Sequence, residues 1–182
     1  MGIWAPCVPR AYQAMANLQI IVFDVCGTAC ALHRSAVREL LPLPRLWRPP
    51  VLPRSVAGFF NLSGQAVPVL RLDVLFGLEQ ADQDPEDALY RHLILFEGKG
   101  ASGVQALLAD RVLDVVRLGM SDVFPVREAE TLNGCVEAEV SWNGQLVHLL
   151  SVERLLLAEE RQALAELSRQ AQNRLGEWAA PA

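Results

Sequence analysis

The stretch NLSGQAVPVLRLDVLFGL, residues 61 to 78, most constrains what this chain can fold into. Its apolar run from Ala66 to Leu78 is interrupted by Pro68 and by one charged pair, Arg71 and Asp73. Nothing in the stretch has the pattern of a nucleophile beside a general base. We interpret it as the scaffold of a binding surface, a hypothesis for which the resemblance described below gives the reason. We expect Arg71 and Asp73 on the same face of one strand, because residues two apart share a face. If that pair is exposed, it adds only about 0.2–1 kcal/mol to stability.

Composition limits the class of protein. The 182 residues suit one domain, or two small units that share one core. Apolar residues make up 52% of the chain, which is enough for a sizeable interior. The net charge is −5, and this argues against a general nucleic-acid binder, which needs cations to replace phosphate counterions. Lys99 is the single lysine, so arginine carries the positive charge and suits bidentate pairs with carboxylates.

Nothing in the sequence predicts secretion or direct membrane insertion. Residues 1 to 16 lack the basic start and continuous apolar centre of a signal peptide, and we expect a loosely ordered leader there, with Met15 as a possible true start. The wholly apolar runs are too short to span a membrane. We expect a cytoplasmic protein. The cysteines form no recognisable disulfide framework; they are Cys7, Cys26, Cys30 and Cys135.

Short strands dominate the first two thirds of the chain. Residues 18–25, LQIIVFDV, are apolar on both faces and predict a strand buried on both sides, which turns at Gly27 into residues 29–32. Residues 35–40 fit a strand or a helix by their period alone. Residues 42–53 hold five prolines and cannot be regular throughout, but strand-like sequence resumes at once, so they are not an interdomain linker.

Two hairpins are predicted in the second half. Residues 92–109 read as two strands joined by a glycine-bearing loop at 97–103. Residues 135–142 alternate between apolar and polar positions, and Asn143-Gly144 follows them before the apolar residues 146–150. Asn-Gly is typical of a type I′ turn because both turn residues must take positive φ.

The hydrophobic period changes from Val152 onward and predicts a C-terminal amphipathic helix. Ser151 is a plausible N-cap and Gly176 a plausible stop. We expect the part of the helix beyond about Gln170 to be frayed or available to a partner. The apolar positions at helical spacing are Leu156, Leu164, Leu167, Ala171, Leu175 and Trp178.

Candidate chemistry is sparse. Cys26, Cys30 and His33 are the nearest approach to a metal-binding set, but their spacing does not match the common zinc motifs and a fourth ligand is unassigned. Ser63 lacks a nearby histidine signature that would mark it as a nucleophile. Asp110 is better explained as a structural residue that ends a strand than as a catalytic carboxylate. We therefore predict no enzyme activity, no catalytic residue, no metal and no cofactor.

The ordered set of motifs resembles the CheW-like domain, the adaptor fold of bacterial chemosensory systems. The resemblance covers about 140 residues, from Leu18 to near Leu157. The stretch VREL (37–40) looks like the family's Val-x-Glu segment, and residues 53–78 look like its Asn-Leu-Arg-Gly and proline segment. Residues 106–116 and 132–156 look like the family's Val-Asp-x-Val segment and its closing hairpin. Each piece alone is weak, and their order and spacing together are specific.

The chain departs from the family pattern at polar positions. Ser63 stands where the family has arginine, and the family's Asp-Leu-Arg is reversed to Arg71-Leu72-Asp73. Ala106 replaces a glycine, and Ser151 replaces an aspartate. Core and turn positions are kept, which is what an intact fold with altered partner contacts would show.

The resemblance implies a mainly β fold of two intertwined five-stranded barrels, followed by the C-terminal amphipathic helix. Together with the leader and the helix read from the residues, it divides the chain into a loosely ordered leader at 1–16, a CheW-like domain at 17–157 and a helical extension at 158–182. The function implied is that of a non-enzymatic adaptor, with the regulatory domain of a CheA-type histidine kinase and the cytoplasmic tip of a methyl-accepting chemoreceptor as partners. The implied receptor groove consists of Val37, Glu39, Asn61, Ser63 and Gly64, with Arg71, Asp73 and Asp110 as structural or orienting residues.

Two alternatives remain open at this point. One is a small β-barrel protein that binds a metal through Cys26, Cys30 and His33, or a ligand between the barrels. The other is a diverged adaptor that no longer binds receptors.

Overall fold

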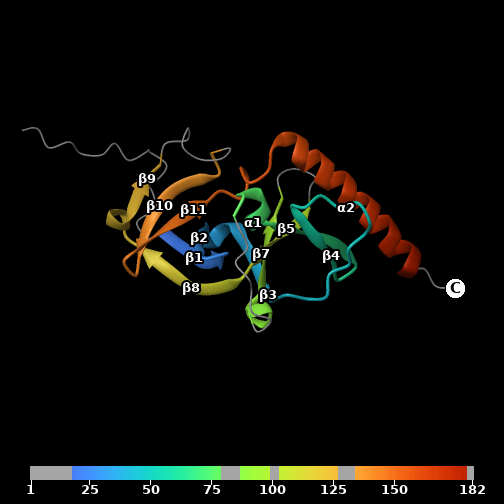
Figure 1. Ribbon diagram of the computed structural model, residues 1–182, viewed down its shortest axis with the longest axis horizontal. Helices are drawn as coiled ribbons and strands as arrows, with labels where there is room; N and C mark the ends of the chain where they lie inside the picture. The colour runs from blue at the N-terminus through green and yellow to red at the C-terminus, as the bar shows by residue number, and fades with distance from the viewer. Residues whose placement is uncertain (1–17, 79–86, 99–102, 127–133, 180–182) are drawn as a thin grey trace, which may run out of the picture.

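Two β-sheets lie side by side, and one long helix runs along the second of them (Figure 1). The computed structural model describes residues 18–78, 87–98, 103–126 and 134–179. The strands are β1 (Leu18–Val25), β2 (Thr28–His33), β3 (Val37–Pro42), β4 (Val56–Leu62), β5 (Gln65–Arg71), β6 (His92–Glu97), β7 (Val104–Ala109), β8 (Arg111–Leu118), β9 (Val123–Pro125), β10 (Val136–Trp142) and β11 (Gln145–Leu150). The α-helices are α1 (Leu72–Leu75) and α2 (Ala158–Ala179), and short 3-10 turns cover Arg34–Ala36, Asp87–Tyr90 and Met120–Asp122.

The first sheet has the strand order β8-β1-β2-β11-β10-β9. Its two hairpins, β1–β2 and β10–β11, are joined by parallel pairing of β2 with β11. Asn143 and Gly144 have φ of +50° and +74°, as the predicted type I′ turn between β10 and β11 requires, so that hairpin prediction is confirmed. The predicted strand at 18–25 is also confirmed.

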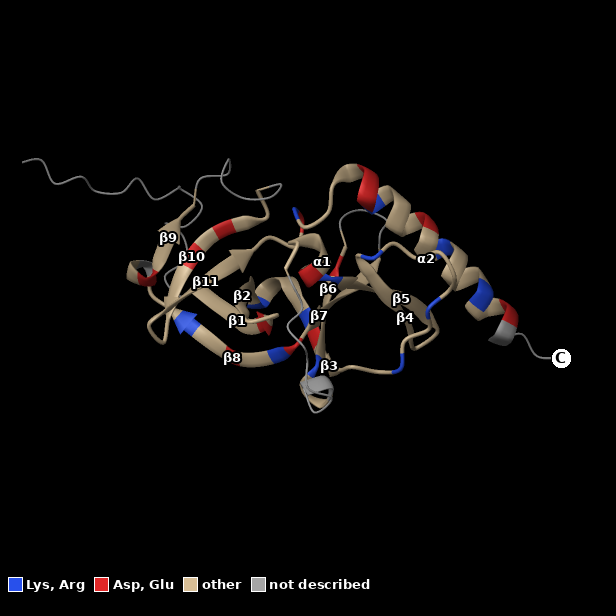
Figure 2. Ribbon diagram, viewed as in Figure 1, with Lys and Arg blue, Asp and Glu red and all other residues tan. Residues whose placement is uncertain are grey.

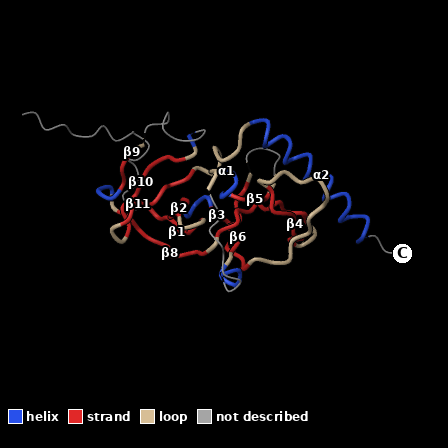
Figure 3. The backbone as a smooth tube through the Cα atoms, in the orientation of Figure 1, coloured by secondary structure: helices blue, strands red, loops and turns tan. Residues whose placement is uncertain are grey.

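The second sheet has the order β3-β6-β7-β5-β4. The open question about residues 35–40 is answered by a short 3-10 turn at Arg34–Ala36 that leads into β3. After β3 the chain crosses to the opposite edge of the sheet, where the backbones of Trp47 and Phe59 exchange two hydrogen bonds of 2.7 and 2.8 Å. Figure 3 shows this connection running around the outer end of the second sheet and passing beneath α2.

The core has three parts because strands in both sheets bury both faces. In β1, Ile20 and Val22 pack inside the first sheet, whereas Ile21 and Phe23 face a cluster shared between the sheets. In β5, Val69 packs inside the second sheet and Leu70 joins the shared cluster. Alternation along a strand thus places successive apolar residues in different cores.

The fold class agrees with the prediction in being mainly β, with two small sheets and a C-terminal helix. One sheet has six strands instead of the predicted five, because the three-residue strand β9 adds to the edge of β10. At the β4 edge of the second sheet, Trp47 pairs with Phe59 as an isolated antiparallel bridge and is not part of a further strand.

The predicted cap and stop residues of the C-terminal helix are wrong, although the helical extension was expected to begin at residue 158, where α2 does begin. Ser151 is not the N-cap, because α2 begins only at Ala158 and the side chain of Ser151 hydrogen-bonds to Glu137. The first turn is capped instead by Glu160, whose Oε2 accepts from the N–H of Leu157 at 2.8 Å. At the other end, the helix passes through Gly176 to Ala179. Within the described ranges, no helix is long and apolar enough to cross a membrane.

A substitution at Gly58 tests the close approach of the Trp47 backbone to β4 at the edge of the second sheet. The φ of Gly58 is +150°, and a Cβ built on it would lie 2.8 Å from the carbonyl oxygen of Trp47. We expect Gly58→Ala to lower the free energy of unfolding by about 1–3 kcal/mol, the usual cost of overpacking. Gly176→Ala is the matched control, because its added methyl meets open space in a helix and should stabilise by about 0.5–1 kcal/mol. Urea unfolding of both variants measures the difference, and equal effects would contradict this account.

Candidate functional site

The turn between β4 and β5 carries three of the predicted binding residues, Asn61, Ser63 and Gly64. Ser63 and Gly64 have φ of +50° and +91°, so this turn also has positive φ at both central residues. Oδ1 of Asn61 accepts a hydrogen bond from the backbone N–H of Gly64 at 2.7 Å. All three residues are exposed. The turn therefore presents a fixed backbone and short side chains to solvent.

The other two predicted binding residues, Val37 and Glu39, lie on β3 at the opposite edge of the same sheet. The strand directions place the start of β3 and the β4–β5 turn at the same end of the sheet. Val37 is buried and Glu39 is exposed. No hydrogen bond or ion pair among the described residues joins Val37 or Glu39 to the turn. Whether the five residues act as one groove stays a prediction.

The distal half of α2 holds the β4–β5 hairpin in place. Oε1 of Gln172 accepts from the N–H of Ala66 at 2.8 Å, and its Nε2 donates to the carbonyl of Gly64 at 2.9 Å. One side-chain amide thus satisfies a donor and an acceptor at the edge of the hairpin. Ala171 is buried beside it. The expectation was that the helix beyond about Gln170 is frayed or available to a partner. The contacts of Gln172 and Ala171 argue against fraying, and availability to a partner stays a prediction.

A groove lies between α2 and the outer strands of the second sheet. Its volume is about 660 Å³. Aromatic side chains form much of it, and charged residues stand at its rim. The lining residues are Arg45, Trp47, Phe59, Phe60, Asn61, Ala66, Ala171, Arg174, Leu175 and Glu177. Asn61 therefore belongs both to the exposed turn and to this groove.

Arg71 and Asp73 do not share the face of one strand, because β5 ends at Arg71 and Asp73 lies in the short helix α1. The two side chains nevertheless form a bidentate ion pair, with Nε of Arg71 donating to Oδ1 of Asp73 at 3.2 Å and Nη2 donating to Oδ2. The Asp73 side chain is only 9% exposed. The hydrogen bond that Arg71 donates to Asp73 raises the pKa of Arg71. The pair is thus a partly buried structural contact.

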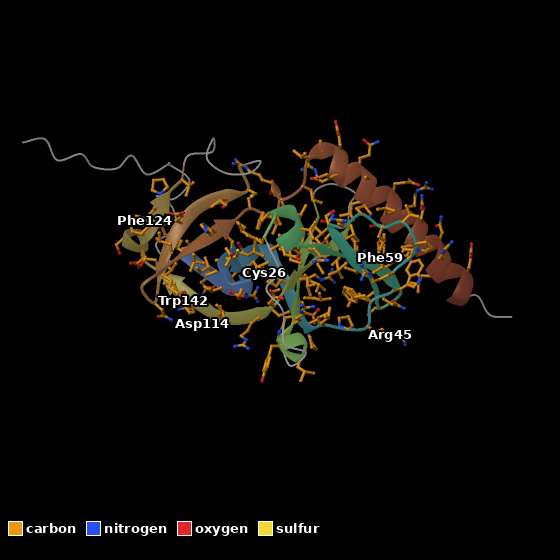
Figure 4. All side chains as sticks on the ribbon, viewed as in Figure 1. Cys26, Arg45, Phe59, Asp114, Phe124 and Trp142 are labelled. Carbon is orange, nitrogen blue, oxygen red and sulfur yellow. The ribbon has the colours of Figure 1, made fainter. Side chains whose placement is uncertain are left out.

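Asp110 lies where the chain passes from the second sheet to the first, between β7 and β8. Its Oδ2 accepts from the N–H of Cys26 at 2.8 Å, and its Oδ1 lies 3.4 Å from Nε of Arg91. Its own N–H bonds to the carbonyl of Asp24. Burial raises the pKa of the Cys26 thiol, and the charge of Asp110 adds to the effect. Cys26 lies near the centre of the molecule, where the two halves meet (Figure 4).

Cys26, Cys30 and His33 are not brought together as metal ligands. Cys30 and His33 are three apart on β2 and so face opposite sides of the strand. Cys30 lies in the shared core, where burial raises its pKa to about 12. Nε2 of His33 lies 3.1 Å from Oε2 of Glu137 on β10. Among the described residues, no group of three or more potential ligands is placed to hold a metal ion.

Sequence reasoning missed the groove and the two hydrogen bonds by which the Gln172 side chain holds the β4–β5 hairpin. Gln172 lies 106 and 108 residues from its two partners, so no local pattern could connect them. One signal was available: the apolar spacing of Ala171 and Leu175 continues past Gln170, which indicates a helix face that remains packed. What the site offers chemically is a rigid turn beside an apolar groove, which suits binding.

The pair of His33 and Glu137 predicts a pH dependence of stability. Hydrogen bonding to His33 lowers the pKa of Glu137 below 4.5, with smaller contributions from Ser151 and Arg154. A carboxyl whose pKa is lowered by folding stabilises the protein above its unfolded pKa, and this contribution is lost as the pH falls through the folded pKa. We expect Glu137→Gln to be less stable than the parent at about pH 6, and the difference to shrink toward about pH 3. Thermal melts across this range test it, and a constant difference would contradict it.

The burial of Asp73 changes the expected effect of removing its partner. We expect Arg71→Ala to lower the free energy of unfolding by about 1–3 kcal/mol, between the ~0.2–1 kcal/mol of an exposed pair and the ~3–5 kcal/mol of a fully buried one. Arg169→Ala is the control, since Arg169 makes an exposed bidentate pair with Glu166. Urea titration of both variants provides the measurement. An Arg71→Ala loss no larger than that of Arg169→Ala would contradict the structural role.

Comparison with known proteins gives a consistent result. The family model for the CheW-like domain matches residues 19–160. The chemotaxis protein CheW of Helicobacter pylori is 28% identical over 140 residues, which cover 76% of this chain and 81% of that protein. Protein FrzA of Myxococcus xanthus is 28% identical over 166 residues, which cover 88% and 99%. The crystal structure of the scaffolding protein TtCheW from Thermoanaerobacter tengcongensis has a TM-score of 0.68 at 19% identity and covers 87% of this chain and 96% of that one.

The resemblance seen in the sequence is therefore confirmed by the family match, and the two-sheet architecture by the solved structure. The family consists of scaffold proteins and not of enzymes. This chain belongs to the CheW-like domain family and is a scaffold or adaptor of the chemotaxis type.

Proposed function

We propose that this protein couples a chemoreceptor to a CheA-type histidine kinase as a non-enzymatic adaptor. The observation that carries the proposal is the family match over residues 19–160, which includes both sheets and the start of α2. The partners would be the cytoplasmic tip of a methyl-accepting receptor and the regulatory domain of the kinase. The protein would work in the cytoplasm, where both partners present these parts.

The exposed β4–β5 turn supports a receptor contact at Asn61, Ser63 and Gly64. Its backbone is fixed by the Asn61 side chain at one end and by Gln172 from α2. A surface that is already ordered loses little conformational entropy on binding. Glu39, which is exposed on the other edge strand at the same end of the sheet, would contribute to the contact, whereas the buried Val37 would act only by shaping that strand.

Ser63 would alter this contact compared with related adaptors. An arginine at this position could donate charge-assisted hydrogen bonds to a receptor carboxylate, each contributing about 1.5–3 kcal/mol. Serine is short and neutral and cannot reach as far. We therefore propose weak binding to an ordinary receptor tip, with kinase binding retained through a different surface.

Ser63→Arg tests the placement of the receptor surface. We expect the substitution to strengthen binding to a standard receptor tip at least about tenfold, which corresponds to one such hydrogen bond. Binding to the kinase regulatory domain should stay constant. Both are measured by pull-down and by titration with purified partners.

Ser121→Arg serves as the matched control, since it adds the same charge at an exposed serine beyond the other sheet. An equal gain in receptor binding from both variants would show that the gain comes from the added net charge and not from position 63. Unchanged receptor binding by Ser63→Arg, or loss of kinase binding, would show that the receptor surface lies elsewhere. Absence of binding to either partner in every form would overturn the proposed function itself.

A further inference from the structure

The groove beside α2 adjoins a second hollow, which lies between α2 and the connection from β3 to β4. The second hollow has a volume of about 240 Å³ and shares Trp47, Phe59, Ala171 and Arg174 with the first. Its far wall is the segment from Pro49 to Leu52. The Trp47 side chain, 42% exposed, stands between the two hollows. The structure thus has an elongated apolar trough between α2 and the connection from β3 to β4.

Val51 projects from the rim of this trough. It is 96% exposed, and its φ is +66°. Positive φ is strongly disfavoured for a β-branched residue. A strained and fully exposed apolar side chain gains nothing within its own chain, since it buries almost no surface there. Because Val51 lies at the rim of the trough, another molecule that binds there can bury its side chain.

The rim also carries two charges of opposite sign that do not pair with each other. Arg174 and Glu177 are three residues apart on α2, and neither has an ion-pair partner among the residues that the structure describes. Earlier in the same helix, Glu166 and Arg169 at the same spacing form a bidentate pair of 2.7 and 2.8 Å. The order of Arg174 and Glu177 is also the less favourable one, because an acid that precedes a base along a helix is the better arrangement.

Arg174 instead lies over the ring of Trp47, with its guanidinium carbon 6.0 Å from the ring centroid. Figure 2 shows residues of both charges distributed along α2. A rim that carries both signs does not select an anion or a cation. It is complementary to a surface with the same two charges in the opposite direction.

We propose that this trough is the interface between two copies of this chain. In a two-fold symmetric dimer, each surface meets an identical surface, so residue i contacts j and j contacts i. The trough and Val51 lie on the same face, and Val51 of each copy would enter the trough of the other. Arg174 and Glu177 would form reciprocal ion pairs between the copies. The proposal does not depend on receptor or kinase binding.

Val51→Asp is the decisive variant. Aspartate tolerates positive φ better than valine, so the fold should not be weakened. We expect the parent protein to show a concentration-dependent monomer–dimer equilibrium in sedimentation velocity without any partner present. Val51→Asp should raise the dissociation constant at least about tenfold, as expected for a buried interface residue. Leu89→Asp is the matched control, because Leu89 is 82% exposed and lies away from the trough; it should leave the equilibrium unchanged.

A charge exchange tests the reciprocal pairs. Arg174→Glu and Glu177→Arg should each weaken the dimer, and the double variant should restore it, because both pairs are then re-formed with exchanged signs. A parent protein that stays monomeric at all concentrations would overturn the proposal. So would a dimer that Val51→Asp leaves intact, or single charge variants whose effects simply add in the double variant.

Discussion

The shared apolar layer between the two sheets is the constraint on which the rest of the structure depends. Ile21 and Phe23 enter it from β1, Leu70 from β5, and Leu164 and Ala171 from α2. Neither sheet could leave this face exposed to water, because each side chain contributes about 1.5–3 kcal/mol when it is fully buried. The stretch at residues 61–78 is apolar for this reason: its strand must fill the interior of its own sheet with one face and the shared layer with the other.

Features that depend on local sequence could be predicted well. The strand at Leu18–Val25 is apolar at successive positions because it is covered on both sides, and the β10–β11 hairpin follows from Asn143-Gly144. The start of α2 could not be read in the same way. Its cap comes from Glu160, inside the helix, and no polar N-cap residue precedes the first turn. A search for such a residue therefore selects Ser151, which lies well before the helix and whose side chain hydrogen-bonds to Glu137.

Arg71 and Asp73 show a second limit of local reasoning. Their spacing of two predicts a common face only if the strand continues, and the chain instead turns into α1 immediately after Arg71. The candidate site shows the same division. Asn61, Ser63 and Gly64 are neighbours in sequence and remain neighbours in space, whereas Gln172 reaches the turn from more than a hundred residues away. Contacts of that kind depend on how α2 packs, and the sequence pattern carries that information only as the apolar face of the helix.

The construction of the β4–β5 turn explains how position 63 can depart from the family pattern without loss of the fold. The turn is held by the side chain of Asn61 and by the amide of Gln172, and both contacts are made to backbone atoms. The side chain of Ser63 takes no part in either contact and is exposed. A substitution there changes the chemistry that the turn presents at the surface, while the backbone of the turn stays the same. The packing of α2 against β5 thus stabilises the turn without using the side chain of residue 63, and this position can vary while the fold is kept.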